Sequence, residues 1–241
     1  MSQPNEPTYI QHEAPATKRR FPRWALAAVG ALLLAGAGGT FASFSASTTN
    51  SSAFSTGSLV LSNQKDANTV CLSTAGGNTD TNDNAGCDAA YALTVKKPGD
   101  SATVNITLKN EGSLDATDLK AFVSSACVSS DEGTETYHGT GDICANLRFY
   151  IQSYTTAGRT VVSSCYYGGV TVANTCDFTN AAKTLADYST TYPNSSTTLS
   201  MGTMTTGTSR FLTLGLQLPS SAGNSLQGRK AAFGLKWQIV Q

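Results

Sequence analysis

The chain has 241 residues, with 16 basic and 16 acidic side chains and a formal net charge of zero. Only 13% of its residues are charged, and no basic patch interleaved with aromatic residues occurs, which argues against binding to nucleic acid. The abundance of Ser, Thr, Asn and Gly is typical of a secreted β protein and argues against a cytosolic enzyme.

The N-terminal residues 1–42 are interpreted as a cytoplasmic extension followed by a signal peptide. Residues 1–17 are polar, contain three prolines and show no periodicity. A basic cluster at Lys18–Arg23 then precedes the apolar run Trp24–Ala42, which is the order of a secretory signal. An uncleaved membrane anchor is the alternative, because this run is close to the roughly 20 residues that span a bilayer.

Cleavage is expected between Ala42 and Ser43, where small residues follow the apolar run. The membrane then takes part only through the uncleaved precursor. Cleavage would free an extended arm, residues 43–55, in which Phe44 and Ala46 alternate with serines and Phe54 stands near the end. We expect this arm to be a donor strand, with Phe44, Ala46 and Phe54 as its inserted apolar residues.

Beyond the arm, a period of two dominates residues 56–241, and we expect one all-β domain there. The clearest half-buried strands alternate apolar and polar residues at 102–108, 212–218 and 233–239. Further strands are expected at 59–61, 91–95, 119–123, 147–154, 160–162 and 166–172. About eight to ten strands with polar loops predict a jelly-roll-like two-sheet sandwich. Residues 180–188 are the only candidate for a short helix.

Six cysteines follow the export signal: Cys71, Cys87, Cys127, Cys144, Cys165 and Cys176. An even number behind such a signal predicts disulfides formed in an oxidising compartment. Six thiols allow 15 pairings, which sequence alone does not resolve. We favour the pairing of nearest neighbours, because each such bridge would close a loop between predicted strands.

Motifs for catalysis and metal binding are weak. His138 is the only histidine after the export signal, and it lies in a polar loop without a recognisable triad or zinc motif. We therefore expect no enzyme, no cofactor and no metal centre. The segment Asp80–Gly86 imitates the start of a calcium loop, but its glycine is displaced by one position and Tyr91 stands where a glutamate is required. A solvated loop tied off by a disulfide is the favoured interpretation.

Three separated stretches together resemble the camelysin/TasA family of secreted bacterial proteins. The first is Gly38–Ser45 followed by FSTGSLVLS at 54–62, and the second is Lys97–Asp100 followed by the strand to Leu108 and KNEGSL at 109–114. The third joins Leu218-Pro219, NSLQG at 224–228 and the strand to Trp237. The cysteine-bearing segments 71–87 and 127–176 have no counterpart in this resemblance.

The resemblance implies a jelly-roll subunit that is cut by a dedicated signal peptidase and exported. It also implies fibres in which the N-terminal arm of one subunit completes the sheet of the next. The family's metalloendopeptidase label lacks ligands here, because one histidine cannot build the usual zinc site.

We therefore expect a secreted structural subunit of an extracellular fibre, pilus or biofilm matrix. Its partners would be other copies of itself, arranged head to tail, and a minor subunit that starts or anchors the fibre. A secreted metalloendopeptidase and a monomeric cell-surface adhesin are the alternatives.

Overall fold

The computed structural model describes residues 56–76, 82–88, 97–133 and 136–241, all within the compact unit Ser55–Gln241. The predicted signal segment, the arm and the expected strand at 91–95 lie outside these ranges. Among the described residues, antiparallel strands dominate, which confirms the all-β class.

The larger sheet has six strands in the order β2-β1-β3-β10-β5-β6. Its members are β1 (Leu61–Lys65), β2 (Cys71–Leu72), β3 (Ser101–Asn110), β5 (Arg148–Tyr154), β6 (Val162–Tyr167) and β10 (Ser209–Gln217). A short 3-10 helix, η1 (Ser73–Gly76), follows β2. Strands β3 and β10 lie at the centre of this sheet although about 100 residues separate them in sequence.

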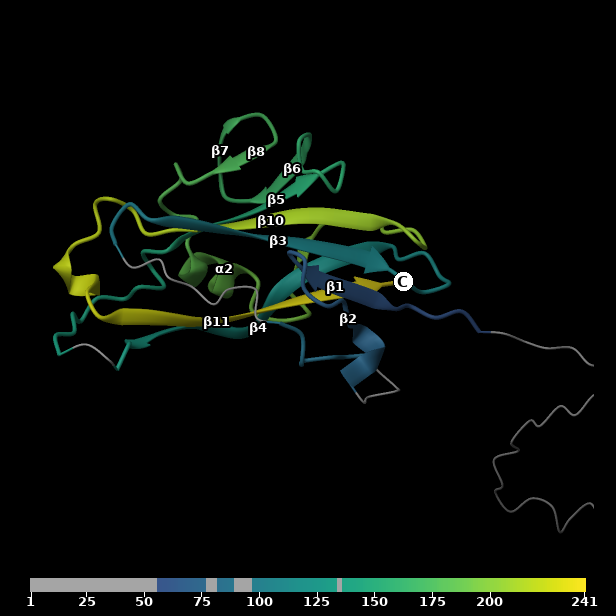
Figure 1. Cartoon of the computed structure of the whole chain (residues 1–241), viewed down its shortest axis with the longest axis horizontal. Helices are drawn as coiled ribbons and strands as arrows, with labels where there is room; N and C mark the ends of the chain where they lie inside the picture. Colours follow the sequence, from purple (N-terminus) through teal and green to yellow (C-terminus); the bar gives the residue numbers. More distant parts are fainter. Residues whose placement is uncertain (1–55, 77–81, 89–96, 134–135) are drawn as a thin grey trace, which may run out of the picture. The chain divides into compact units, whose positions relative to one another are not determined.

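The second sheet has the order β11-β4-β9, with β4 (Asp118–Asp131), β9 (Leu199–Ser200) and β11 (Arg229–Val240). Figure 1 shows it facing the larger sheet, so the two sheets form two layers. A separate hairpin, β7 (Gly169–Val172) and β8 (Thr175–Asp177), projects from the outer side of the larger sheet (Figure 1).

The alternating leucines of β10 supply the centre of the core. Leu212 and Leu214 are fully buried, and they pair in register with Ile106 and Val104 of β3. Because successive side chains of a strand point to opposite faces, the apolar members of both strands meet on one face of the sheet. Each fully buried leucine contributes roughly 1.5–3 kcal/mol to folding.

Between the two sheets lies the helix α2 (Leu185–Thr191), seen in Figure 1. It begins at Thr184, whose hydroxyl accepts a hydrogen bond from the Asp187 amide, as is typical of a helix N-cap. Its Tyr188 is completely buried and packs edge-on against Phe149 of β5 at 5.3 Å between ring centroids. The helix begins five residues later than the sequence predicts, because residues 180–184 form turns capped by Asn180.

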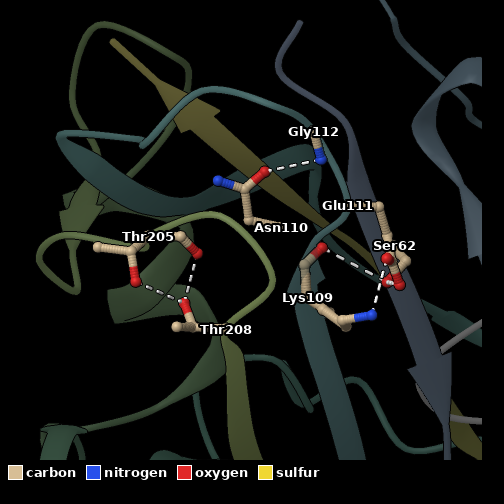
Figure 2. Close-up of polar contacts among 7 residues, drawn as sticks. All are labelled: Ser62, Lys109, Asn110, Glu111, Gly112, Thr205 and Thr208. Atoms are coloured by element: carbon tan, nitrogen blue, oxygen red, sulfur yellow. Dashed lines mark hydrogen bonds and ion pairs between the residues drawn. The ribbon is translucent and has the colours of Figure 1, made fainter.

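The turn after β3 carries the NEGSL motif, and Figure 2 shows its polar contacts. The buried Asn110 amide donates to the carbonyls of Leu114 and Met204, and its oxygen accepts from the Gly112 amide at 3.0 Å. A Cβ at Gly112 would lie 2.2 Å from the Ser58 carbonyl oxygen, so only glycine fits this turn. The motif thus joins the β3 turn to the segment before β1.

Several strand boundaries differ from the sequence prediction. The strands expected at 59–61 and 160–162 share only their last residue with β1 and β6. The expected strand 166–172 is divided between β6 and β7, because Gly168 has φ of 141° and lies against Tyr150, where the chain changes direction. Strand β4 runs to Asp131, well beyond the expected end at Val123, because it stays paired with β11 through a bulge around Gly234. In the described residues the strands number eleven, several of them only two to four residues long.

All six cysteines form disulfides, and the pairing of nearest neighbours is confirmed. The Cα–Cα distances are 5.5 Å for Cys71–Cys87, 5.9 Å for Cys127–Cys144 and 5.0 Å for Cys165–Cys176. Each bridge closes a loop of 11 to 17 residues, which in the chain-entropy account stabilises the fold by roughly 3 kcal/mol.

Candidate functional site

Strand β11 forms one edge of the smaller sheet. In the order β11-β4-β9 it has a single neighbour, β4, within the described residues. Among the described residues, the backbone N–H and C=O groups along the other edge of β11 thus have no strand partner, which is the condition for strand addition. Twelve residues of β11 present this edge.

A groove of about 700 Å³ lies between β11 and the β1–β3 side of the larger sheet. Its apolar surface includes Leu61 of β1, Ile106 of β3 and Leu216 of β10 on one side. Phe233, Leu235 and Trp237 of β11 supply the other side. The two sheets therefore leave an apolar space between them along this side of the sandwich.

The apolar residues of β11 are only partly buried, although their alternation is as regular as that of β10. Within β11, no residue is fully buried, whereas β10 buries five consecutive residues from Leu212 to Leu216. Exposure of Phe233, Leu235 and Trp237 toward a groove is costly, because about 25 cal/mol is lost for each Å² of apolar surface left in water. Such surface marks an interaction site.

The loop 82–88 forms part of the rim of the groove and connects its two sides. The Asn82 amide donates to the Leu59 carbonyl at 2.9 Å, beside β1. The carboxylate of Asp83 pairs with the Lys236 ammonium of β11 at 2.5 Å. Both partners of this ion pair are exposed, so it contributes little to stability.

Two buried polar atoms belong to residues that line the groove and have no hydrogen-bond partner: Oδ1 of Asn63 and Nε of Arg229. Asn63 follows Leu61 at a spacing of two on β1, so both side chains lie on the inner face of the sheet. Arg229 begins β11, pairs with Asp131 and donates to the Ser129 hydroxyl at 3.0 Å. Both atoms are shielded from solvent, and among the described residues neither has a hydrogen-bond partner.

An aromatic cluster adjoins the groove: Phe233, which lines it, packs edge-on against Phe149 and Tyr188. Desolvation by burial raises the pKa of the Tyr188 hydroxyl, which has no hydrogen-bond partner. Desolvation also raises the pKa of the nearby Tyr167, whose hydroxyl donates to Asp187 at 2.6 Å. These tyrosines stay neutral and pack as core residues, so they are no candidates for acid–base chemistry.

The residues predicted for cleavage, Ala42 and Ser43, and for the donor strand, Phe44, Ala46 and Phe54, lie outside the described residues. Their predicted roles stay predictions.

His138 lies in its loop with Nδ1 3.3 Å from the Gly228 carbonyl oxygen, which links this loop to the start of β11. Within the described residues, no three His, Cys, Asp or Glu side chains gather in an arrangement that could hold a metal ion.

The candidate calcium loop is described only from Asn82 onward. Asn84 uses its side chain locally, donating to the Leu72 carbonyl at 2.8 Å and accepting from the Gly86 amide. With Asp83 paired to Lys236 and Asn82 bonded to Leu59, these side chains tie the loop to both sides of the groove.

The arrangement is suited to binding an extended peptide. An edge strand supplies a row of backbone partners, and the groove supplies apolar contacts for alternate side chains. Sequence periodicity identified the apolar face of β11. It gave no signal for the groove, because period two is the same at an open edge and in a closed core.

Comparison with protein-family models and with curated proteins finds no match for this chain. In the part of the chain that the structure describes, no helix has the length and apolar character needed to cross a bilayer.

Proposed function

We propose that this protein is a secreted structural subunit that polymerises head to tail, with the N-terminal arm of one copy bound along β11 of the next. The observation that carries the proposal is the groove of about 700 Å³ beside β11, which the described residues line with both apolar and polar side chains. An added strand would pair with the free edge of β11 and cover Phe233, Leu235 and Trp237.

The arm matches this site in length and pattern. Residues 43–55 are about as long as the 12 residues of β11, and both would extend roughly 40 Å at 3.3 Å per residue. Phe44, Ala46 and Phe54 share one face of an extended arm. Burying each phenylalanine in the groove would contribute roughly 1.5–3 kcal/mol.

The edge of β11 favours a peptide over an aliphatic ligand. A hydrocarbon chain cannot pair with backbone N–H and C=O groups, whereas every residue of a peptide other than proline offers both.

Head-to-tail docking of this kind generates filaments. The arm and the groove are different surfaces of the same chain, so the contact is heterologous and leaves a free arm or a free groove at each end. Two copies that exchange arms reciprocally would instead form a closed dimer, and gel filtration distinguishes this outcome from filaments.

The proposal also includes export of the chain from the cell. The segment before Ser43 would act as a signal peptide, cut by a signal peptidase, and the mature domain would be a jelly roll outside the cell. The three disulfides support an oxidising compartment. The resemblance to the camelysin/TasA family rests on the sequence motifs alone, among them NEGSL at 110–114 and NSLQG at 224–228.

The test compares the mature chain, starting at Ser43, with a chain that lacks residues 43–54. The shortened chain retains the compact unit with its core and all three disulfides, so it should fold. We expect fibres from the full mature chain and monomers from the shortened one, judged by negative-stain microscopy and gel filtration.

Matched variants of unchanged length test whether the apolar face of the arm is what drives fibre formation. Replacing Phe44 and Phe54 with Ser should abolish fibres, whereas replacing Ser45 and Ser47 with Thr should leave them intact. Fibres formed by the shortened chain would reject the donor role of the arm.

A further inference from the structure

Two motifs that are distant in the sequence contact each other where the chain enters β1. The segment 56–60 belongs to FSTGSLVLS and lies beside the turn 111–114 of NEGSL. The amide of Ser58 donates to the Ser113 hydroxyl at 2.9 Å. The carbonyl of Ser58 accepts from the amides of Ser113 and Leu114 at 2.9 and 3.2 Å. We call these two segments together the exit clamp.

Further contacts hold the exit clamp on both sides of Ser58. The Glu111 amide donates to the Val60 carbonyl at 2.8 Å, and a Cβ at Gly57 would overlap the Leu114 side chain. The buried Asn110 fixes the turn from its inner side (Figure 2). The segment 56–60 belongs to no strand, so the turn is what holds it in place.

The exit clamp and most of the groove lie toward different ends of the sandwich. Just after the clamp, the Thr117 amide donates to the carbonyl of Val240, near the C-terminus. The groove is lined by β11 from Arg229 to Trp237 and by Leu226, which precedes β11. Figure 1 shows the start of β1 at the end where β11 finishes, away from the end where β11 begins.

Filament growth requires that two copies joined by one arm do not also exchange the second arm. The second insertion within such a pair is intramolecular, so a high effective concentration favours it unless the geometry prevents it. Exchange of an identical element is a low-cost route to closed dimers, and changes at the hinge promote it. A fixed direction of exit prevents the second insertion when it points the free arm away from the groove of the same partner.

We propose that the exit clamp selects filaments over closed dimers by fixing the direction in which the arm leaves the domain. This inference rests on the proposed function and adds to it the element that makes head-to-tail growth win over reciprocal exchange. Gly112 and Ser113 are its positioning residues. Neither is among the described residues that line the groove, so they act on the direction of the arm and not on its binding site.

The test compares the mature chain with two variants by gel filtration and negative-stain microscopy. Ser113→Ala removes the hydroxyl that accepts from Ser58, and Gly112→Ala places a Cβ against the Ser58 carbonyl oxygen. Ser113→Ala should raise the ratio of closed dimer to filament about fivefold, as expected for the loss of one hydrogen bond. Gly112→Ala should raise it about tenfold or more, because the whole segment has to move.

Two control variants keep the exit clamp intact. Ser113→Thr retains the hydroxyl and should keep the ratio of the unmodified protein. Gly158→Ala adds the same methyl group to the turn between β5 and β6, where nothing lies within 4 Å of the new Cβ. It should also keep the ratio of the unmodified protein.

Peptide binding separates a loss of positioning from a damaged groove. A synthetic peptide of residues 43–54 should bind equally to the chain without these residues and to the same chain carrying Ser113→Ala, measured by fluorescence polarisation. Weaker binding to the variant would show that the turn supports the groove, and would overturn the inference.

The remaining outcomes distinguish the inference from the proposed function. Fibres from the unmodified chain, with the same ratio of closed dimer to filament in Ser113→Ala and Gly112→Ala, would overturn the inference and leave the proposed function standing. Failure of the unmodified mature chain to form fibres would overturn the proposed function itself.

Discussion

The two sides of the sandwich differ in how the space between the sheets is filled. On the β4–β5 side, α2 lies between the layers, and Phe149 and Tyr188 are buried there almost completely. On the β1–β11 side, a groove of about 700 Å³ takes the place of such an element, and Phe233, Leu235 and Trp237 stay partly exposed.

This difference shows that a regular strand pattern does not by itself close a core. Strands β10 and β11 both alternate apolar residues, but β10 lies between two neighbouring strands and β11 has one. The open side lacks an element of its own among the described residues. A strand from another copy would do on that side what α2 does on the other.

The largest effect on the free energy of unfolding is expected when the same change, Leu→Ala, is compared in β10 and in β11. Leu212→Ala, at a fully buried site in β10, should lower the free energy of unfolding by about 3 kcal/mol. Leu235→Ala, in the partly exposed series of β11, should cost the monomer about 1 kcal/mol. Urea unfolding of the chain without residues 43–54 measures both. Equal losses would mean that β11 is as closed as β10.

Two disulfides of similar loop length give the next contrast. Replacing either Cys71 and Cys87 or Cys127 and Cys144 with Ala should remove roughly 3 kcal/mol, because the sequence separations are 16 and 17. Only Cys71 and Cys87 line the groove, so only their loss should slow fibre growth at equal folded fraction. Growth rates that fall equally in both variants would contradict this assignment.

On the closed side, two buried tyrosines should respond in opposite ways. Tyr167→Phe loses hydrogen bonds to Asp187 and to the Thr184 carbonyl and should cost about 1–2 kcal/mol. Tyr188→Phe removes a buried hydroxyl that has no partner and should be neutral or slightly stabilising. Thermal unfolding compares the two. A clear loss from Tyr188→Phe would indicate a partner for its hydroxyl.

The smallest effect is expected at the rim. Lys236→Gln removes an exposed ion pair with Asp83 and should change the free energy of unfolding by less than about 0.5 kcal/mol. Any salt dependence of the free energy of unfolding that comes from this ion pair should be absent in the Lys236→Gln variant. A loss above about 1 kcal/mol would show that the loop 82–88 holds the open side together.

Much of the fold could be predicted from the sequence. The alternation in β3, β10 and β11 located the main strands, and the spacing of the cysteines favoured the pairing that forms. The divided strand at Gly168 could not be predicted, because a positive φ at one glycine reverses the chain without changing the apolar pattern on either side.

The donor role of the arm stays a prediction, because the arm lies outside the described residues. The edge position of β11 could not be predicted, because it follows from pairings between distant residues such as those of β4 and β11.

Amide hydrogen exchange on β11 tests the central claim most directly. In the chain without residues 43–54, alternate amides of β11 that face away from β4 should exchange quickly, while the central amides of β10 stay protected. Adding a synthetic peptide of residues 43–54 should slow the β11 amides at least tenfold and leave β10 unchanged. Amides of β11 that are protected before the peptide is added, or that do not respond to it, would contradict the account.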